Sequence, residues 1–134
     1  MCGIAGIYNS TETLNNPEDL LKRMLARIRY RGPDENGIYI NKRVALGSVR
    51  LSIIDIRTGQ QPLSTPDGKY WIVFNGEIFN YIELKADLKH LGYVFRTESD
   101  TEVLLNAYLE YGSDSLKRLN GQFVFAAGLG CATR

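Results

Sequence analysis

A cysteine at the second position has the clearest chemical potential in this chain. If Met1 is removed, Cys2 carries a thiol and a free α-amine on the same Cα. Peptide thiols have a pKa near ~8.5 and α-amines near ~7.7–8.0, so such an amine is partly basic at pH 7 and can accept a thiol proton. One residue would then supply both nucleophile and general base, as an N-terminal threonine does. The alternative is a small apolar residue that begins a strand.

Three further segments carry groups that such a nucleophile needs around it. Arg50 begins an apolar stretch, and its guanidinium can grip a carboxylate with two parallel donors, although an arginine there is more often a surface ion-pair partner. The Asn75 amide beside the Gly76 N–H is a candidate oxyanion hole, but Asn-Gly is also typical of a tight hairpin turn. Asp100 can bind an ammonium group or simply cap the helix that follows it.

Other catalytic schemes have less support in the sequence. The single histidine, His90, lies in an amphipathic segment beside Lys89, and we interpret it as a surface residue. A Cys-His dyad and a metal site are therefore not expected, and no Walker-type phosphate loop occurs. The motif Arg31-Gly32-Pro33-Asp34 is interpreted as a turn that shapes a loop.

Length, charge and cysteine usage narrow the class of protein. A chain of 134 residues is one domain's worth, and its net charge of +1 comes without a long run of one sign. Neither a signal-peptide pattern nor a membrane-spanning apolar stretch is present. Two cysteines far apart favour a reducing compartment. We therefore expect a soluble cytoplasmic protein with no nucleic-acid or membrane partner.

Hydrophobic periodicity and turn residues predict the elements that position these groups. Helices are expected from Asn16-Pro17, with Asn16 as cap, to Gly32-Pro33, and over 81–91 and 99–111. Turns are expected at Asn41-Lys42 and Pro66-Asp67-Gly68. This order favours an α+β fold with mainly antiparallel sheet. Strands are expected over 3–8, 37–40, 44–47, 50–56, 70–75, 93–96 and 123–127.

Several of these segments, taken together and in order, resemble the motifs of class II glutamine amidotransferase domains. Within that superfamily the chain is similar to the N-terminal glutaminase domain of asparagine synthetases, from Cys2 to about Phe125. The motifs that carry the resemblance are Cys2-Gly3-Ile4-Ala5-Gly6, Arg31-Gly32-Pro33-Asp34, Arg50-Leu51-Ser52-Ile53-Ile54-Asp55, Gln61-Pro62-Leu63, Asn75-Gly76-Glu77-Ile78-Phe79-Asn80-Tyr81 and Ser99-Asp100-Thr101-Glu102.

The resemblance implies a role for each site residue. Cys2 would attack the side-chain amide carbon of L-glutamine, and Asn75 with the Gly76 N–H would stabilise the oxyanion. Arg50 would hold the substrate α-carboxylate, and Asp100 would hold its α-ammonium with Glu77. The full set implied to bind glutamine is Arg50, Leu51, Ile53, Asn75, Gly76, Glu77 and Asp100.

The resemblance also implies a fold and partners. The fold would be a four-layer αββα sandwich of antiparallel sheets, of the N-terminal nucleophile hydrolase type. A synthetase domain or subunit would accept the ammonia; ATP and magnesium belong to that partner, with no cofactor in this domain. The chain departs from the family at Gly47-Ser48-Val49, where a histidine is usual, and again after Ala126.

Because of the second departure we expect residues 2–134 to form a partial domain, incomplete at its C-terminal end, with the synthetase domain absent. A homo-oligomer is possible. The alternative to an enzyme is a catalytically inactive fragment, or a module that binds glutamine or another protein.

Overall fold

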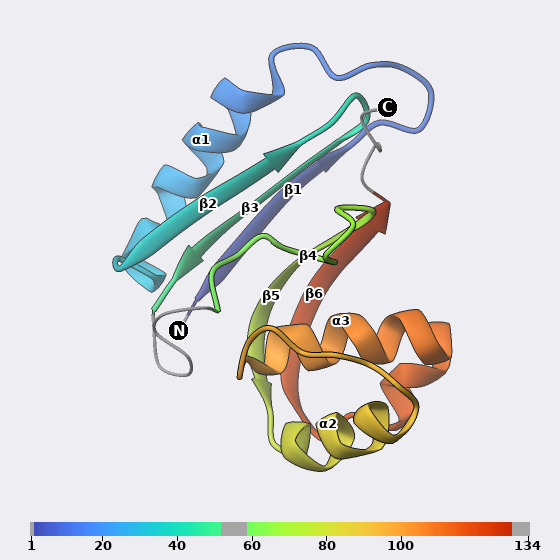
Figure 1. Ribbon diagram of the computed structural model, residues 1–134. Helices are drawn as coiled ribbons and strands as arrows, with labels where there is room; N and C mark the ends of the chain where they lie inside the picture. Colours follow the sequence, from blue (N-terminus) through green and yellow to red (C-terminus); the bar gives the residue numbers. More distant parts are fainter. Residues whose placement is uncertain (1, 52–58, 130–134) are drawn as a thin grey trace.

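Two antiparallel three-stranded sheets form the centre of the molecule, with helices on their outer faces (Figure 1). The computed structural model describes residues 2–51 and 59–129. The molecule has four layers: α1 covers the outer face of the first sheet, the second sheet lies against its inner face, and α2 and α3 cover the outer face of the second sheet. The α+β prediction and the four-layer order are both confirmed.

The first sheet has the strand order β1-β3-β2, formed by β1 (Gly3–Tyr8), β2 (Glu35–Ile40) and β3 (Val44–Arg50). Helix α1 (Pro17–Ile28), followed by the 3-10 turn η1 (Arg29–Arg31), packs on its outer face. Leu25 reaches the sheet directly because Gly47 has no side chain: a Cβ there would lie 2.8 Å from Leu25 Cδ1. Buried Leu21, Leu25, Ala45 and Val49 form the core of this half.

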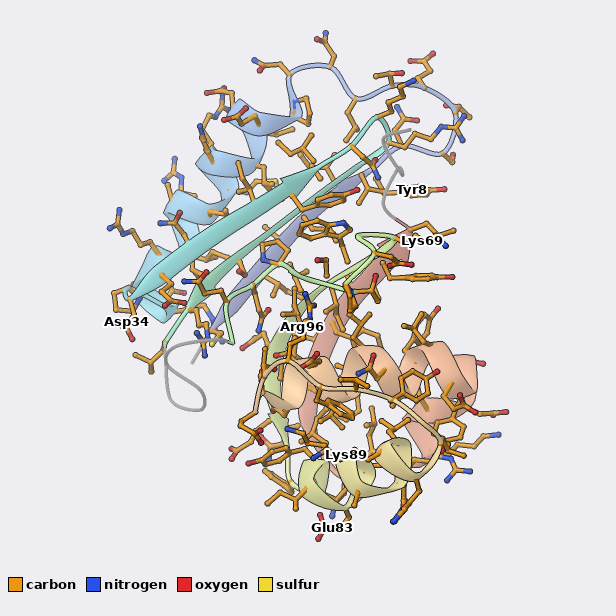
Figure 2. The ribbon with its side chains drawn as sticks, viewed as in Figure 1. Tyr8, Asp34, Lys69, Glu83, Lys89 and Arg96 are labelled. Carbon is orange, nitrogen blue, oxygen red and sulfur yellow. The ribbon has the colours of Figure 1, made fainter. Side chains whose placement is uncertain are left out.

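The second sheet has the order β4-β5-β6, from β4 (Leu63–Ser64), β5 (Tyr70–Ile78) and β6 (Gly121–Leu129). Helices α2 (Tyr81–His90) and α3 (Asp100–Tyr111), with the 3-10 helix η2 (Gly112–Lys117), cover its outer face. On α2 the exposed Glu83 points away from the sheet (Figure 2). This larger core includes Ile72, Phe74, Ile78, Leu84, Leu88, Val103, Leu104 and Leu105.

Strand alternation directs polar residues into the space between the sheets. Val49 belongs to the core beneath α1, so its neighbours Ser48 and Arg50 face the opposite way, toward the second sheet. Phe74 belongs to the core beneath α2 and α3, so Asn75 faces the first sheet. The two groups proposed from sequence to bind a carboxylate and an oxyanion therefore point into the same gap.

Several contacts join the two halves across this gap. Tyr39 of β2 stacks on Trp71 of β5, with ring centroids 4.1 Å apart and planes 15° from parallel. The Ser48 hydroxyl donates a hydrogen bond to the main-chain carbonyl of Gln61, 3.0 Å away. Asn41 Nδ2 also donates to the Leu129 carbonyl at 3.3 Å, and Leu46 and Val73 are buried on the faces that meet. The sheets are thus held together by aromatic, polar and apolar contacts.

Most elements predicted from sequence are confirmed, within a few residues at their ends. The turn before β5 forms as expected, with Gly68 at φ 68°. Asn16 does precede α1, but its side chain makes no capping hydrogen bond and its φ is 46°. His90 is exposed, as interpreted.

Three predictions of elements were wrong or incomplete. Residues 93–96 do not form a strand, because the N–H groups of Arg96 and Thr97 donate to the Glu102 carboxylate rather than to another strand. Arg50 ends β3 instead of beginning a new strand; the rest of the predicted strand 50–56 falls largely outside the described residues. The two-residue β4 was not expected.

Within the two described stretches, each helix is too short or too polar to cross a lipid bilayer.

Candidate active site

A cavity of about 470 Å³ lies between the sheets, within the range of roughly 300–1,000 Å³ typical of small-molecule sites. It brings together residues from β3, β5, β6, the start of α3 and the residue just before β1. Ile53 lies outside the described residues, so its predicted role is not examined by the structure. The other predicted site residues all line the cavity: Cys2, Arg50, Leu51, Asn75, Gly76, Glu77 and Asp100.

Cys2 is half-buried immediately before β1 and lines the cavity. Its Sγ lies 3.6 Å from the Leu51 carbonyl oxygen, to which the thiol donates. Its own carbonyl accepts a hydrogen bond from Arg31 Nε at 3.1 Å. The residue therefore lies just outside the strand that the simpler interpretation would have it begin, and it lines the cavity.

The Arg31-Gly32-Pro33-Asp34 segment packs directly on the end of β3. A Cβ added to Gly32 would lie 2.5 Å from the Arg50 nitrogen, and the Asp34 N–H donates to the Arg50 carbonyl at 3.1 Å. Its interpretation as a loop-shaping element is confirmed. The loop it shapes holds the main chain beside both Cys2 and Arg50.

Arg50 is a buried cation, with 5% of the residue exposed. Its Nη1 lies 3.0 Å from Glu35 Oε2 across the β2–β3 pairing. The simpler interpretation of Arg50 as a surface ion-pair partner is wrong, because β3 is the central strand and this position faces the second sheet. A guanidinium has five donors in a rigid fork, so Glu35 can orient it while it also faces the cavity.

Asn75 and Gly76 lie inside β5, opposite Val124 and Phe123 of β6, so the hairpin-turn interpretation is wrong. Gly76 has a φ of 157°, and a Cβ there would lie 2.2 Å from the Gln122 carbonyl oxygen. The glycine is therefore required by the close approach of β6. This tight packing fixes the strand that carries the Asn75 amide.

Asp100 is the first residue of α3, but it is not the cap. The Ser99 hydroxyl accepts the hydrogen bond from the Thr101 N–H at 3.1 Å, because Ser99 has the extended conformation that suits an N-cap. The Asp100 carboxylate is thereby available to accept from the Ile78 N–H at 3.2 Å, at the end of β5.

Burial raises the pKa of the Asp100 carboxyl above its ordinary value of 3.8. Hydrogen bonds from the main chain of Ile78 and Thr101 oppose that shift, and the nearby Glu77 charge adds to it. Two carboxyl groups therefore face one end of the cavity, where a cation would relieve their repulsion.

Sequence reasoning assigned no chemical role to several residues around the cavity. Arg31, which holds the Cys2 carbonyl, was considered only within its turn motif, and Glu35 directly follows that motif. Gln61 belongs to a quoted motif but had no assigned function. Gln122 could have been noticed as a polar residue in an otherwise apolar strand.

The family match and the curated relatives point to the same kind of domain. The model of the glutamine amidotransferase domain family matches residues 1–127. The glutamine-hydrolyzing asparagine synthetase 1 of Bacillus subtilis is 47% identical over 127 residues, which are 93% of this chain and 20% of the relative. A probable asparagine synthetase of Dictyostelium discoideum is 39% identical over 126 residues, 93% of this chain and 23% of the relative. The chain thus spans about a fifth of the length of the curated relatives that it matches.

A solved structure supports the fold. Glutamine phosphoribosylpyrophosphate amidotransferase from B. subtilis, in complex with ADP and GMP, superimposes with a TM-score of 0.75 and 22% identity, covering 96% of this chain and 35% of that chain. At this identity the likeness concerns architecture alone. The family match along nearly the whole sequence establishes that this chain belongs to the glutamine amidotransferase domain family.

Proposed function

We propose that this chain hydrolyses the side-chain amide of L-glutamine to glutamate and ammonia, with Cys2 as nucleophile. One observation carries the proposal: a single cavity joins a thiol, a buried guanidinium, a strand amide and a buried carboxylate. A free amino acid has a carboxylate and an ammonium at one end, and its recognition requires a fixed cation and a fixed anion. Arg50 and Asp100 supply this pair.

The mechanism requires Met1 to be removed, so that Cys2 has a free α-amine. That amine accepts the thiol proton as Sγ attacks the amide carbon and the carbon–oxygen π pair moves onto oxygen. The Asn75 amide and the Gly76 N–H stabilise the resulting oxyanion. The protonated amine then gives its proton to the leaving nitrogen, ammonia departs, and a thioester remains on Cys2.

Water completes the cycle. The α-amine, now neutral, accepts a proton from a water molecule that attacks the thioester carbon. Collapse of the second oxyanion expels the Cys2 thiolate, which regains its proton from the amine, and glutamate leaves. Under this proposal the chemistry of this domain needs no metal ion or cofactor.

We further propose that the ammonia serves asparagine synthesis in a synthetase domain or subunit. The support is the similarity to proteins named as glutamine-hydrolyzing asparagine synthetases, of which this chain matches about a fifth. ATP and magnesium would be used by that partner. A cytoplasmic location, with no nucleic-acid or membrane partner, is part of the same proposal.

Release of ammonia and glutamate from L-glutamine tests the proposed reaction. The chain without Met1 should release the two products in equal amounts, and Cys2→Ala should reduce the rate to background, because the thioester cannot form. Glutamine binding without product release would contradict the enzymatic proposal and support a glutamine-binding module instead.

A further inference from the structure

We infer that Gln61 is a positioning residue that fixes the spacing of Arg50, Asn75 and Asp100 around the substrate. The inference rests on the proposed function, because it concerns the same cavity. Gln61 lines that cavity, and three of its polar atoms form hydrogen bonds to three different parts of the fold.

The side-chain amide of Gln61 replaces a missing strand partner. Strand β4 pairs Leu63 with Ile72, and continuing this antiparallel register would place Gln61 opposite Phe74. The paired strand β4 is only two residues long, however, and the Gln61 side chain takes over: its Oε1 accepts from the Phe74 N–H at 2.6 Å. This bond holds the edge of β5 one residue before Asn75.

The other end of the same amide holds helix α3. Gln61 Nε2 donates to Thr101 Oγ1 at 3.2 Å, and Thr101 is almost fully buried, with 2% exposed. Thr101 directly follows Asp100. One planar amide therefore sets the distance from the strand that bears the oxyanion donor to the helix that bears the ammonium partner.

The main chain of Gln61 extends this connection to the first sheet. Its carbonyl accepts from Ser48 Oγ, on the same face of β3 as Arg50 and two residues before it. The carbonyl also lies tightly against β2, since a Cβ on Gly37 would be 2.0 Å from it. Gln61 is thus braced between both sheets and α3, and each of its three hydrogen bonds reaches a residue within two positions of a site residue.

Removal of the Gln61 amide should therefore weaken recognition of glutamine and leave the reactivity of the Cys2 thiol unchanged. Glutamine must meet Arg50, Asp100 and the oxyanion donors at once, so small shifts of β5 relative to α3 weaken recognition of the substrate. The reactivity of the Cys2 thiol toward a small reagent does not require that spacing, because the hydrogen bonds of Gln61 reach Ser48, Phe74 and Thr101, on elements other than the one that carries Cys2.

Two alkylation rates on the Met1-free chain test the inference. The first reagent is an electrophilic glutamine analogue, which needs the intact binding site, and the second is iodoacetamide, which does not. Gln61→Met keeps the side-chain length and removes the amide. We expect analogue labelling at Cys2 to slow about tenfold, as for a lost hydrogen bond, with iodoacetamide labelling within about twofold of wild type. The exposed neighbour offers the control Gln60→Met, with both rates unchanged.

An analogue rate within twofold of wild type in Gln61→Met, or a parallel change of both rates, would overturn the inference. If Gln61→Met does not fold, Thr101→Val removes the acceptor of the Nε2 bond with an isosteric side chain and should give a selective loss of the same kind, no larger than that of Gln61→Met. Where both variants fold, the double variant should be no slower than Gln61→Met, because that substitution already removes the bond through which Thr101 acts; additive losses would contradict this. Failure of wild type to react with the analogue would instead count against the proposed function.

Discussion

At the residue scale, the two ionic partners proposed for glutamine are held in different ways. Arg50 is buried with a counter-ion, Glu35, 3.0 Å away on the adjacent strand. Asp100 is buried against the Ile78 N–H, with another acid, Glu77, nearby. Desolvation raises the pKa of the Asp100 carboxyl. The anionic end of the site is therefore electrostatically strained without a ligand, and the ammonium of a substrate would relieve it.

This strain predicts that Asp100→Asn keeps or raises the stability of the fold while it weakens the binding of glutamine. An asparagine still offers an oxygen to the Ile78 N–H but carries no charge. Because the folded-state pKa is raised, the ionised aspartate costs stability at neutral pH, and this cost disappears as pH falls through the raised pKa toward 3.8. The variant should be at least as stable as wild type to urea at pH 7, with the difference shrinking toward acid.

For the same variant, kcat/KM for glutamine should fall about 10- to 100-fold through loss of a charge-assisted contact. A variant that is more than about 1 kcal/mol less stable at pH 7, with kcat/KM preserved, would show that Asp100 has a structural role and does not bind the substrate.

At the element scale, the site residues come together because glycines at two positions allow neighbouring main chains to pack in close contact. Gly32 brings the loop after α1 onto β3, and Gly76 brings β6 onto β5. Arg31 then reaches the Cys2 carbonyl. The nucleophile is positioned by a loop from which it is 29 residues distant in sequence.

Two glycine variants test this close packing. In Gly32→Ala the added methyl would lie 2.5 Å from main-chain atoms of Val49 and Arg50, so the loop must move. We expect a loss of about 1–3 kcal/mol in the free energy of unfolding. Gly6→Ala is the matched control: its methyl would meet Leu46 at 3.4 Å, an ordinary contact, and the change should stay within about 0.5 kcal/mol. Equal effects of the two substitutions in urea titrations would contradict the role given to Gly32.

Elements defined by local signals could be predicted from sequence, and those defined by distant partners could not. The periodicity of apolar residues and the Pro17 and Gly112 boundaries were sufficient for α1, α2 and α3. The segment 93–96 has strand-like residues, yet its N–H groups bind the Glu102 carboxylate on α3. The same limit applies to the site: its motifs were recognised by resemblance, while the contacts of Arg31, Glu35 and Gln61 depend on which elements meet in space.

At the scale of the whole molecule, two hydrophobic cores lie on either side of the gap that holds the candidate site. Each sheet is stabilised mainly by its own helices, and the candidate site occupies the space between these halves. The stacked pair Tyr39–Trp71 joins the two sheets. The relative position of the halves thus depends in part on this pair.

Tyr39→Ala tests how strongly this aromatic pair holds the sheets together. Loss of the stacked ring should lower the free energy of unfolding by about 1–3 kcal/mol and shift the emission of Trp71, the single tryptophan of the chain, to longer wavelength. Tyr30, which is 80% exposed, provides the control Tyr30→Ala, for which neither quantity should change. Unchanged emission in Tyr39→Ala would show that the ring does not shield Trp71 from water.

The central claim is that Cys2, with a free α-amine, is the nucleophile for glutamine in this cavity. Intact-mass and peptide mass spectrometry after reaction with the electrophilic glutamine analogue test it most directly. The predicted result is one adduct per chain, located on Cys2 of molecules that lack Met1, and its suppression by excess L-glutamine. An adduct elsewhere, or labelled molecules that retain Met1, would contradict the account.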